Sequence, residues 1–161
     1  MTPDFSRIRP FTVGTSTYDG AYVQACIAYS GDLDRDLREI YAWIAFWGAV
    51  AADAKQGYDA KEAAYRTARD RFVVGKVLGS AKITKTLASN ELWRGEPEYL
   101  QWEATKSEAE RAWNIAAAVH EACDRKAGLL QSQVKLFLAD VGAYGRSARG
   151  TTPPDGHGET R

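Results

Sequence analysis

A regular repeat of apolar residues begins after Asp32 and runs through the first half of the chain. The repeat alternates steps of four and three residues over more than thirty positions, and only Lys61 interrupts it. Its members are Ile40, Ile44, Trp47, Ala51, Ala54, Tyr58, Tyr65, Ala68 and Phe72. An average spacing of 3.5 residues places these side chains along one face of a helix that packs along its length. The repeat therefore predicts one long helix, which Asp32 or Asp34 caps at its start and which ends at Gly75 and Gly79.

A second helical pattern follows Pro97, a residue well suited to the first position of a helix. No proline or glycine occurs between Pro97 and Gly128, and Gly128 is a single break that a helix tolerates. Gly142 and Gly145 are expected to mark the end of this helix. The apolar members of the second pattern are Trp102, Ala109, Ala112, Ala116, Val119, Cys123, Leu130 and Phe137.

These two patterns predict an all-α chain in which two long helices form a helical hairpin. A connector with short helical pieces, residues 76–96, joins the helices. We divide the 161-residue chain into an irregular N-terminal arm (1–31), a helical oligomerising domain (32–145) and a disordered C-terminal tail (146–161). The tail is expected to be disordered because it is polar and rich in glycine and proline.

The structure of the arm and the association state of the chain each have two possible interpretations. The arm is expected to hold one short helix near Tyr22–Tyr29, or instead a strand pair around Phe11–Val13. Four tryptophans lie at helix positions that cannot all face one partner helix, so we expect further copies of the chain to cover the remaining apolar faces in a homo-oligomer. These tryptophans are Trp43, Trp47, Trp102 and Trp113. In the alternative, the arm folds back and completes a monomeric bundle.

The sequence composition indicates in which cellular compartment the protein is found. No run of 18 apolar residues is present, so no membrane-spanning segment is expected. The N-terminal residues lack the apolar stretch of a secretory signal. Cys26 and Cys123 lie far apart in the sequence without a partner motif, which favours reduced thiols over a disulfide. We therefore expect a cytoplasmic protein, in the host cytoplasm if the chain is encoded by a phage.

Charge is distributed unevenly along a chain whose 21 basic and 21 acidic residues cancel. Residues 61–94 carry a net charge of +5, and residues 95–124 carry a net charge of −5. In one interpretation the cations are favoured at a helix C-terminus and pair across the hairpin with Glu98, Glu103 or Glu108. In the other, the cations form an anion site, above all for the phosphates of a nucleic acid.

The second interpretation defines a candidate nucleic-acid-binding set. Most of its members are cations from the end of the first helix and from the connector, and one is a tryptophan that could offer a stacking surface for a base. The candidates are Arg66, Arg69, Arg71, Lys76, Lys82, Lys85, Trp93 and Arg94. Copies of this cluster repeated around a symmetry axis would produce a field that one copy cannot.

Motifs for catalysis are poorly represented. His120 and Glu121 lack the second histidine of a HExxH metalloprotease helix, and alanine at position 117 removes a Glu-x-x-His pair. The GxxxxGK[ST] spacing of a phosphate loop, GxSxG and Cys-x-x-Cys are also absent. We therefore expect a binding protein that is not an enzyme, with no catalytic residues, no metal site and no cofactor.

The layout resembles the phage recombination-mediator family typified by UvsY. The resemblance covers residues 35–140: two long helices, an arginine-rich end to the first, a connector with Lys and Thr, and an aromatic-led second helix. The matching segments are YAWIAFW (41–47), TARDRFVVG (67–75), KTLASNEL (85–92), YLQW (99–102) and KAGLLQSQVKLF (126–137). The longer N-terminal arm and the Pro/Gly-rich tail are departures from the family layout.

The resemblance implies a function. Members of this family are small helical proteins that assemble into rings, bind single-stranded DNA and help a RecA-like recombinase load onto strands coated by a single-strand-binding protein. Arg69 falls on a basic position of the family, and a second such position falls on Thr67, with Arg66 adjacent. A single-stranded DNA-binding recombination mediator is thus the expected function. The alternative is a non-catalytic helical adaptor or minor virion protein that binds only other proteins.

Overall fold

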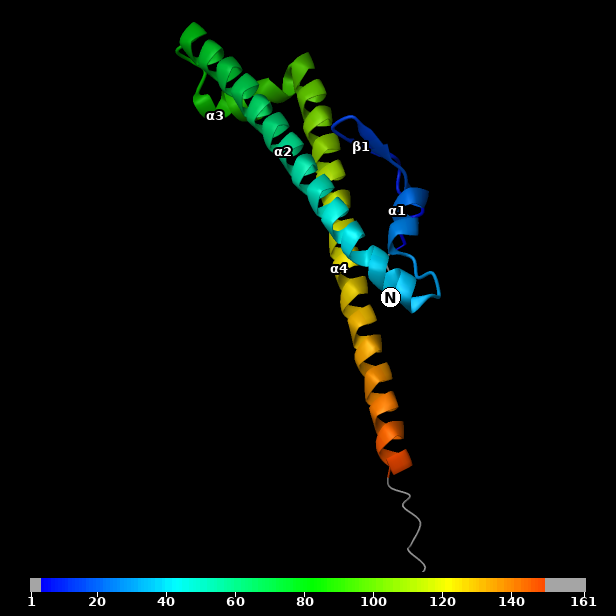
Figure 1. Ribbon diagram of the computed structural model, residues 1–161. Coiled ribbons are helices and arrows are strands. Elements are labelled where there is room, and N and C mark those ends of the chain that lie inside the picture. Colours follow the sequence, from blue (N-terminus) through cyan, green and yellow to red (C-terminus); the bar gives the residue numbers. More distant parts are fainter. Residues whose placement is uncertain (1–3, 150–161) are drawn as a thin grey trace, which may run out of the picture.

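Two long antiparallel helices make up most of the molecule (Figure 1). The computed structural model describes the backbone of residues 4–149 and the side chains of residues 4–141. Helix α2 spans Leu33–Gly79 and helix α4 spans Pro97–Arg149. The predicted helical hairpin is therefore confirmed. Within the described residues, no helix is both long enough and apolar enough to cross a membrane.

Helix α2 begins and ends at residues that the sequence predicts, although residues 76–79, which were expected in the connector, belong to the helix. The Asp32 side chain accepts hydrogen bonds from the backbone N–H groups of Asp34 and Arg35, at 3.0 and 3.1 Å. These bonds satisfy two of the N–H groups that a helix leaves without partners in its first turn. Glycine at position 79 is the last residue of the helix. The cap is thus Asp32, and Asp34 belongs to the first turn.

The apolar repeat of α2 faces α4 and the arm. Every member of the repeat is buried or half-buried, whereas Lys61, which interrupts it, is exposed. Its most buried member, Trp47, is 0% exposed. On α4 the buried residues are Ala112, Ala116, Val119, Ala122, Cys123, Lys126, Ala127 and Leu130. The α2–α4 seam is therefore the central interface of the fold, and it ends near Leu130.

Helix α4 continues past the two glycines that were expected to end it. Its backbone remains helical through Gly142 and Gly145 and reaches Arg149. A single glycine costs a helix only about 1 kcal/mol relative to alanine, and no proline follows Pro97 until Pro153. The expected end was therefore wrong. Positions 146–149 of the expected tail belong to α4, and positions 150–161 lie outside the described residues.

The arm contains both of the structures that were treated as alternatives. Strands β1 (Phe11–Val13) and β2 (Ser16–Tyr18) form an antiparallel hairpin, and helix α1 spans Gly20–Ile27. Gly14 has a φ of 59°, a conformation that suits the two-residue turn between the strands. The arm is thus more regular than expected, because a tight turn and an Asp19 cap organise it locally.

The arm folds back onto the hairpin, as the monomeric alternative predicted. Phe11, Val23 and Ile27 are at most 1% exposed and belong to the same buried cluster as Trp47 and Val119. Figure 1 shows the arm lying against the middle of the α2–α4 pair, away from the connector. One continuous core therefore joins the arm to both long helices.

The connector is made of short helical pieces. Helix α3 (Lys85–Leu87) leads into a π-helical turn, η1 (Ala88–Leu92), and a 3₁₀ turn, η2 (Trp93–Gly95). Thr84 caps α3 by accepting a hydrogen bond from the N–H of Leu87 at 3.2 Å. The connector packs against the end of α2 and so closes the hairpin.

Candidate nucleic-acid interface

The predicted cations gather at the end of the hairpin where α2, the connector and α4 meet. We call residues 66–99 the hairpin tip. All seven predicted cations are solvent-accessible: Arg69 is half-buried, and Arg66, Arg71, Lys76, Lys82, Lys85 and Arg94 are exposed. The connector brings residues that are separated by more than twenty positions, such as Arg71 and Arg94, to the same end of the molecule.

Three of these cations have an acidic partner. Arg66 pairs with Glu62 at 2.7 Å, one turn earlier on α2, and Arg69 pairs with the adjacent Asp70 at 3.3 Å. Lys76 pairs with Glu96 at 3.4 Å and also lies 4.9 Å from the centre of the Phe72 ring. All six side chains in these pairs are at least 30% exposed, so each pair contributes little stability and the cations stay accessible to other anions.

The other four cations, Arg71, Lys82, Lys85 and Arg94, form no ion pair with any residue in the described part of the chain. The tip therefore presents more positive charge than its own carboxylates neutralise.

The acids of α4 are mostly engaged elsewhere. Glu103 pairs with Lys106 at 3.5 Å, and Glu108 pairs with Arg111 at 2.8 Å, in both cases within α4. The expected pairing of Arg66, Arg69 or Arg71 with Glu98, Glu103 or Glu108 is not found. Lys76 and Glu96, a carboxylate in the short link before α4, form an ion pair that joins α2 to the acidic side of the hairpin.

Trp93 is a core residue of the tip. It is 2% exposed, and its indole N–H donates to the hydroxyl of Tyr65 at 3.3 Å. Its ring packs against Phe72 and Tyr99, with centroids 5.3 and 6.1 Å away. A base needs an open ring face to stack on, so this burial removes Trp93 from the candidate interface. Its structural role is to hold the connector against α2 and α4.

A shallow hollow lies beside Arg71 on the surface of α2. It encloses about 550 Å³ and is lined by Thr67, Asp70, Arg71, Val74 and Gly75. Val74 lines the same hollow as Arg71 and is 55% exposed, so the hollow also offers apolar surface. Arg71 supplies a charge for phosphate, and the apolar neighbour supplies a surface that the face of a base could cover.

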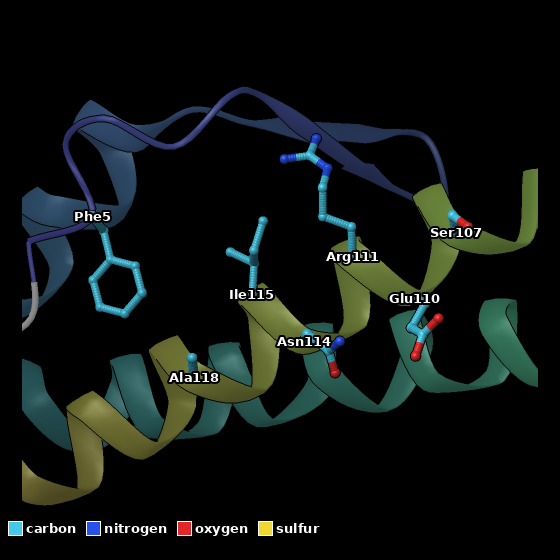
Figure 2. A pocket seen from close by; sticks show the side chains of 7 residues that line it. All are labelled: Phe5, Ser107, Glu110, Arg111, Asn114, Ile115 and Ala118. Carbon is cyan, nitrogen blue, oxygen red and sulfur yellow. The ribbon is translucent and has the colours of Figure 1, made fainter. Parts of the chain in front are cut away.

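A second hollow lies between the arm and the first half of α4 (Figure 2). It encloses about 420 Å³ and is lined by Phe5, Ser107, Glu110, Arg111, Asn114, Ile115 and Ala118. Figure 2 shows Arg111 reaching from α4 toward the chain of the arm. Its guanidinium donates to the carbonyls of Arg9 and Pro10 at 3.3 and 2.8 Å. This cation therefore holds the arm in place.

The groups considered for catalysis occupy structural positions. The Nε2 atom of His120 lies 3.9 Å from a carboxylate oxygen of Asp124, and its ring packs over Gly48, where an added Cβ would lie 3.3 Å from Nε2. Cys26 and Cys123 are free and buried, and burial raises the pKa of the Cys123 thiol to about 11. Within the described residues, no group of three or more His, Cys, Asp or Glu side chains is placed to hold a metal ion.

The fold and the site together define a class: a helical hairpin whose N-terminal arm packs on its middle and whose tip is cationic. Comparison with protein-family models, with curated proteins and with solved structures finds no match for this chain.

Proposed function

We propose that the hairpin tip binds the phosphate backbone of single-stranded DNA. The observation that carries this proposal is the set of four exposed cations, Arg71, Lys82, Lys85 and Arg94, that lack an acidic partner among the described residues. Cations that contact phosphates release condensed counterions, and this release favours binding without regard to base sequence.

The chemistry of the tip fits a flexible strand better than a rigid duplex. The cations lie on α2, in the loop before α3, on α3 and on η2, and a flexible single strand can adjust to cations on several short elements. Exposed apolar side chains lie among them: Val74 and Leu78 are 55% and 83% exposed. Unstacked bases of a single strand can cover such side chains, whereas the bases of a duplex face inward.

The biological role that we propose is recombination mediation. The resemblance to the phage mediator family supports this role, because such proteins hand single-stranded DNA from a single-strand-binding protein to a RecA-like recombinase. In this proposal, copies of the chain assemble into a homo-oligomer, and one strand contacts the cationic tips of more than one copy. The bound strand then takes a path that the recombinase can extend.

The test is binding of a labelled oligonucleotide at several salt concentrations. We expect Arg71→Ala/Lys82→Ala/Lys85→Ala to weaken binding and to reduce the slope of log affinity against log salt by about 2, since each lost phosphate contact on a single strand removes about 0.7. Arg125→Ala is the matched control, because Arg125 is an exposed cation on α4 far from the tip. An unchanged affinity and slope in the triple variant would contradict the proposal.

A second candidate function is a non-catalytic adaptor or minor virion protein that binds only other proteins. Exposed apolar side chains support it, above all Leu78 and Leu100 near the tip and Phe137 at the far end of α4. The same assay separates the two functions. An adaptor would show no oligonucleotide binding even at low salt.

A further inference from the structure

The far end of α4 extends beyond the rest of the fold. Figure 1 shows the orange end of α4 running alone past the arm and past the start of α2. We call residues 131–141 the α4 extension. Ten of these eleven residues are exposed, and Val134 is half-buried. The start of α2 touches the beginning of the α4 extension, where the side-chain amide of Gln131 donates to the hydroxyl of Tyr41 at 2.8 Å, and most of the extension beyond it is open.

The α4 extension continues the apolar pattern of the α2–α4 seam. Ala127, Leu130, Val134, Phe137 and Val141 are spaced by steps of three and four residues, so they share one face of the helix. The first two are 7% and 1% exposed in the seam, whereas Phe137 and Val141 are 64% and 51% exposed. The same face is thus covered up to Leu130 and left open beyond it.

We infer that this open face pairs with the same face of a second copy, with the two α4 extensions running antiparallel. In this arrangement Phe137 of each copy packs against Val134 and Val141 of the other. The inference does not depend on the proposed binding of DNA. Its first support is continuity, because the exposed stripe is a direct prolongation of an interface that α2 already fills.

The direction of pairing follows from where α2 lies. The open stripe faces the side of α4 that α2 occupies before Leu130. A second α4 packed on this stripe in parallel would run back into the space of α2 and of the loop between α1 and α2. An antiparallel second copy reduces this overlap to the last turns of each α4, because pairing centred on Phe137 places residues 145–149 of one copy opposite residues 126–130 of the other. The two copies then contribute the same residues to the interface and are related by a two-fold axis.

The residues beside the stripe are compatible with self-association. Gln131 and Gln133 are uncharged, so no like charges oppose each other across the paired faces there. When the two helices run antiparallel, Lys135 of each copy lies near Asp140 of the other copy, and these two residues have opposite charges. Leu138 is 61% exposed next to Phe137 and widens the apolar surface.

The test measures mass as a function of protein concentration by sedimentation. We expect two copies for the wild-type chain, and we expect Phe137→Glu to raise the dissociation constant at least about 30-fold, as for an interface residue worth 2 kcal/mol. The variant should fold normally, because Phe137 is exposed in the single copy. Leu100→Glu is the matched control: Leu100 is 69% exposed at the opposite end of α4 and should leave the mass unchanged.

The direction of pairing is tested separately, by energy transfer between labels on introduced cysteines. We expect strong transfer between copies labelled at Lys135→Cys and none between copies labelled at Ser89→Cys in the tip, since α2 alone, with 47 residues, is about 70 Å long. Native Cys26 and Cys123 are buried and do not compete for the label.

Three results would overturn the inference: a wild-type chain that stays single at all concentrations, an association that Phe137→Glu does not weaken, or strong transfer between labels at the tips. Since Arg71→Ala/Lys82→Ala/Lys85→Ala should pair normally, failure of the pairing and failure of DNA binding can be told apart.

Discussion

The arm-bearing middle of the hairpin and the tip satisfy their charges in different ways. In the middle, Lys126 and Asp36 form a buried ion pair at 3.0 Å, with side chains only 7% and 6% exposed. Lys126 also donates to the carbonyl of Ala28 at 2.6 Å, and Asp36 accepts from the N–H of Ser30 at 3.1 Å. At the tip, Arg71 and Lys85 remain exposed without an acidic partner among the described residues.

This difference separates a charge that fixes the fold from charges that are available for binding. A buried cation must keep its partners, because an unpaired charge in the interior is strongly unfavourable. An exposed cation is solvated, so it can exchange water and small ions for another anion at little cost. We therefore expect substitutions in the middle of the hairpin to change stability, and substitutions at the tip to change binding.

The largest effect is expected at Lys126. Lys126→Met keeps most of the side-chain length but leaves Asp36 buried without its cation, which should lower the free energy of unfolding by about 3–5 kcal/mol. The neighbouring Arg125→Met is the control. Arg125 is exposed and pairs with Glu121 on the surface, so its loss should change stability by at most about 1 kcal/mol. Denaturant unfolding measures both, and equal effects would contradict the comparison.

Two glycine-to-alanine changes are expected to have smaller effects on stability, and the two effects have opposite signs. At Gly20 an added Cβ would lie 2.5 Å from the carbonyl oxygen of Phe5, so Gly20→Ala should displace the arm and destabilise the protein by about 1–3 kcal/mol. At Gly57 nothing lies within 4 Å of the added Cβ, so Gly57→Ala should stabilise α2 by up to about 1 kcal/mol. Thermal unfolding of both variants tests this; stabilisation by Gly20→Ala would show that the arm is loosely attached.

The smallest effect is expected from a change of pH: the stabilisation by Asp36 is unchanged near neutral pH and decreases only in acid. Burial by itself raises the pKa of this carboxyl, but the hydrogen bonds from Lys126 and Ser30 outweigh burial and lower the pKa below its ordinary value. The stabilisation is therefore complete above the pKa of the unfolded chain and is lost as the pH falls through the pKa of the folded state.

Unfolding free energies measured over an acid pH series should show this loss in the wild-type chain. Asp36→Asn, which cannot titrate, should show a shallower dependence over the same range. Identical slopes for the two proteins would mean that the buried pair does not contribute to acid sensitivity.

The repeating patterns made the two long helices predictable. Steps of three and four residues gave the apolar faces of α2 and α4, and Asp32 and Pro97 gave their starts. The end of α4 was not predictable, because Gly142 and Gly145 are compatible both with a helix and with its end. The arm was only partly predictable, since its strands are three residues long and depend on packing against the long helices.

The cations of the candidate site were predictable as a set, but their individual roles were not. Charge counts located the tip, whereas the partner of each cation depends on side-chain geometry that spacing does not reveal. Trp93 illustrates the same limit: a tryptophan beside Arg94 is equally compatible with a stacking surface and with a core residue. Lys126 carried an overlooked signal, because it lies three residues after Cys123 and four before Leu130, within the apolar repeat. Such a lysine can be buried with a partner, as Lys126 is, or exposed, as Lys61 is, so the spacing alone does not distinguish the two cases.

The anchoring of the arm by Arg111 has a consequence for how this chain can vary. The guanidinium binds main-chain oxygens at positions 9 and 10, and every amino acid supplies such an oxygen. Replacement of Arg9 by another residue would therefore preserve these two hydrogen bonds, whereas replacement of Arg111 would remove both of them. Related chains could diverge freely in this part of the arm and still dock it in the same place, provided that the helix keeps its arginine.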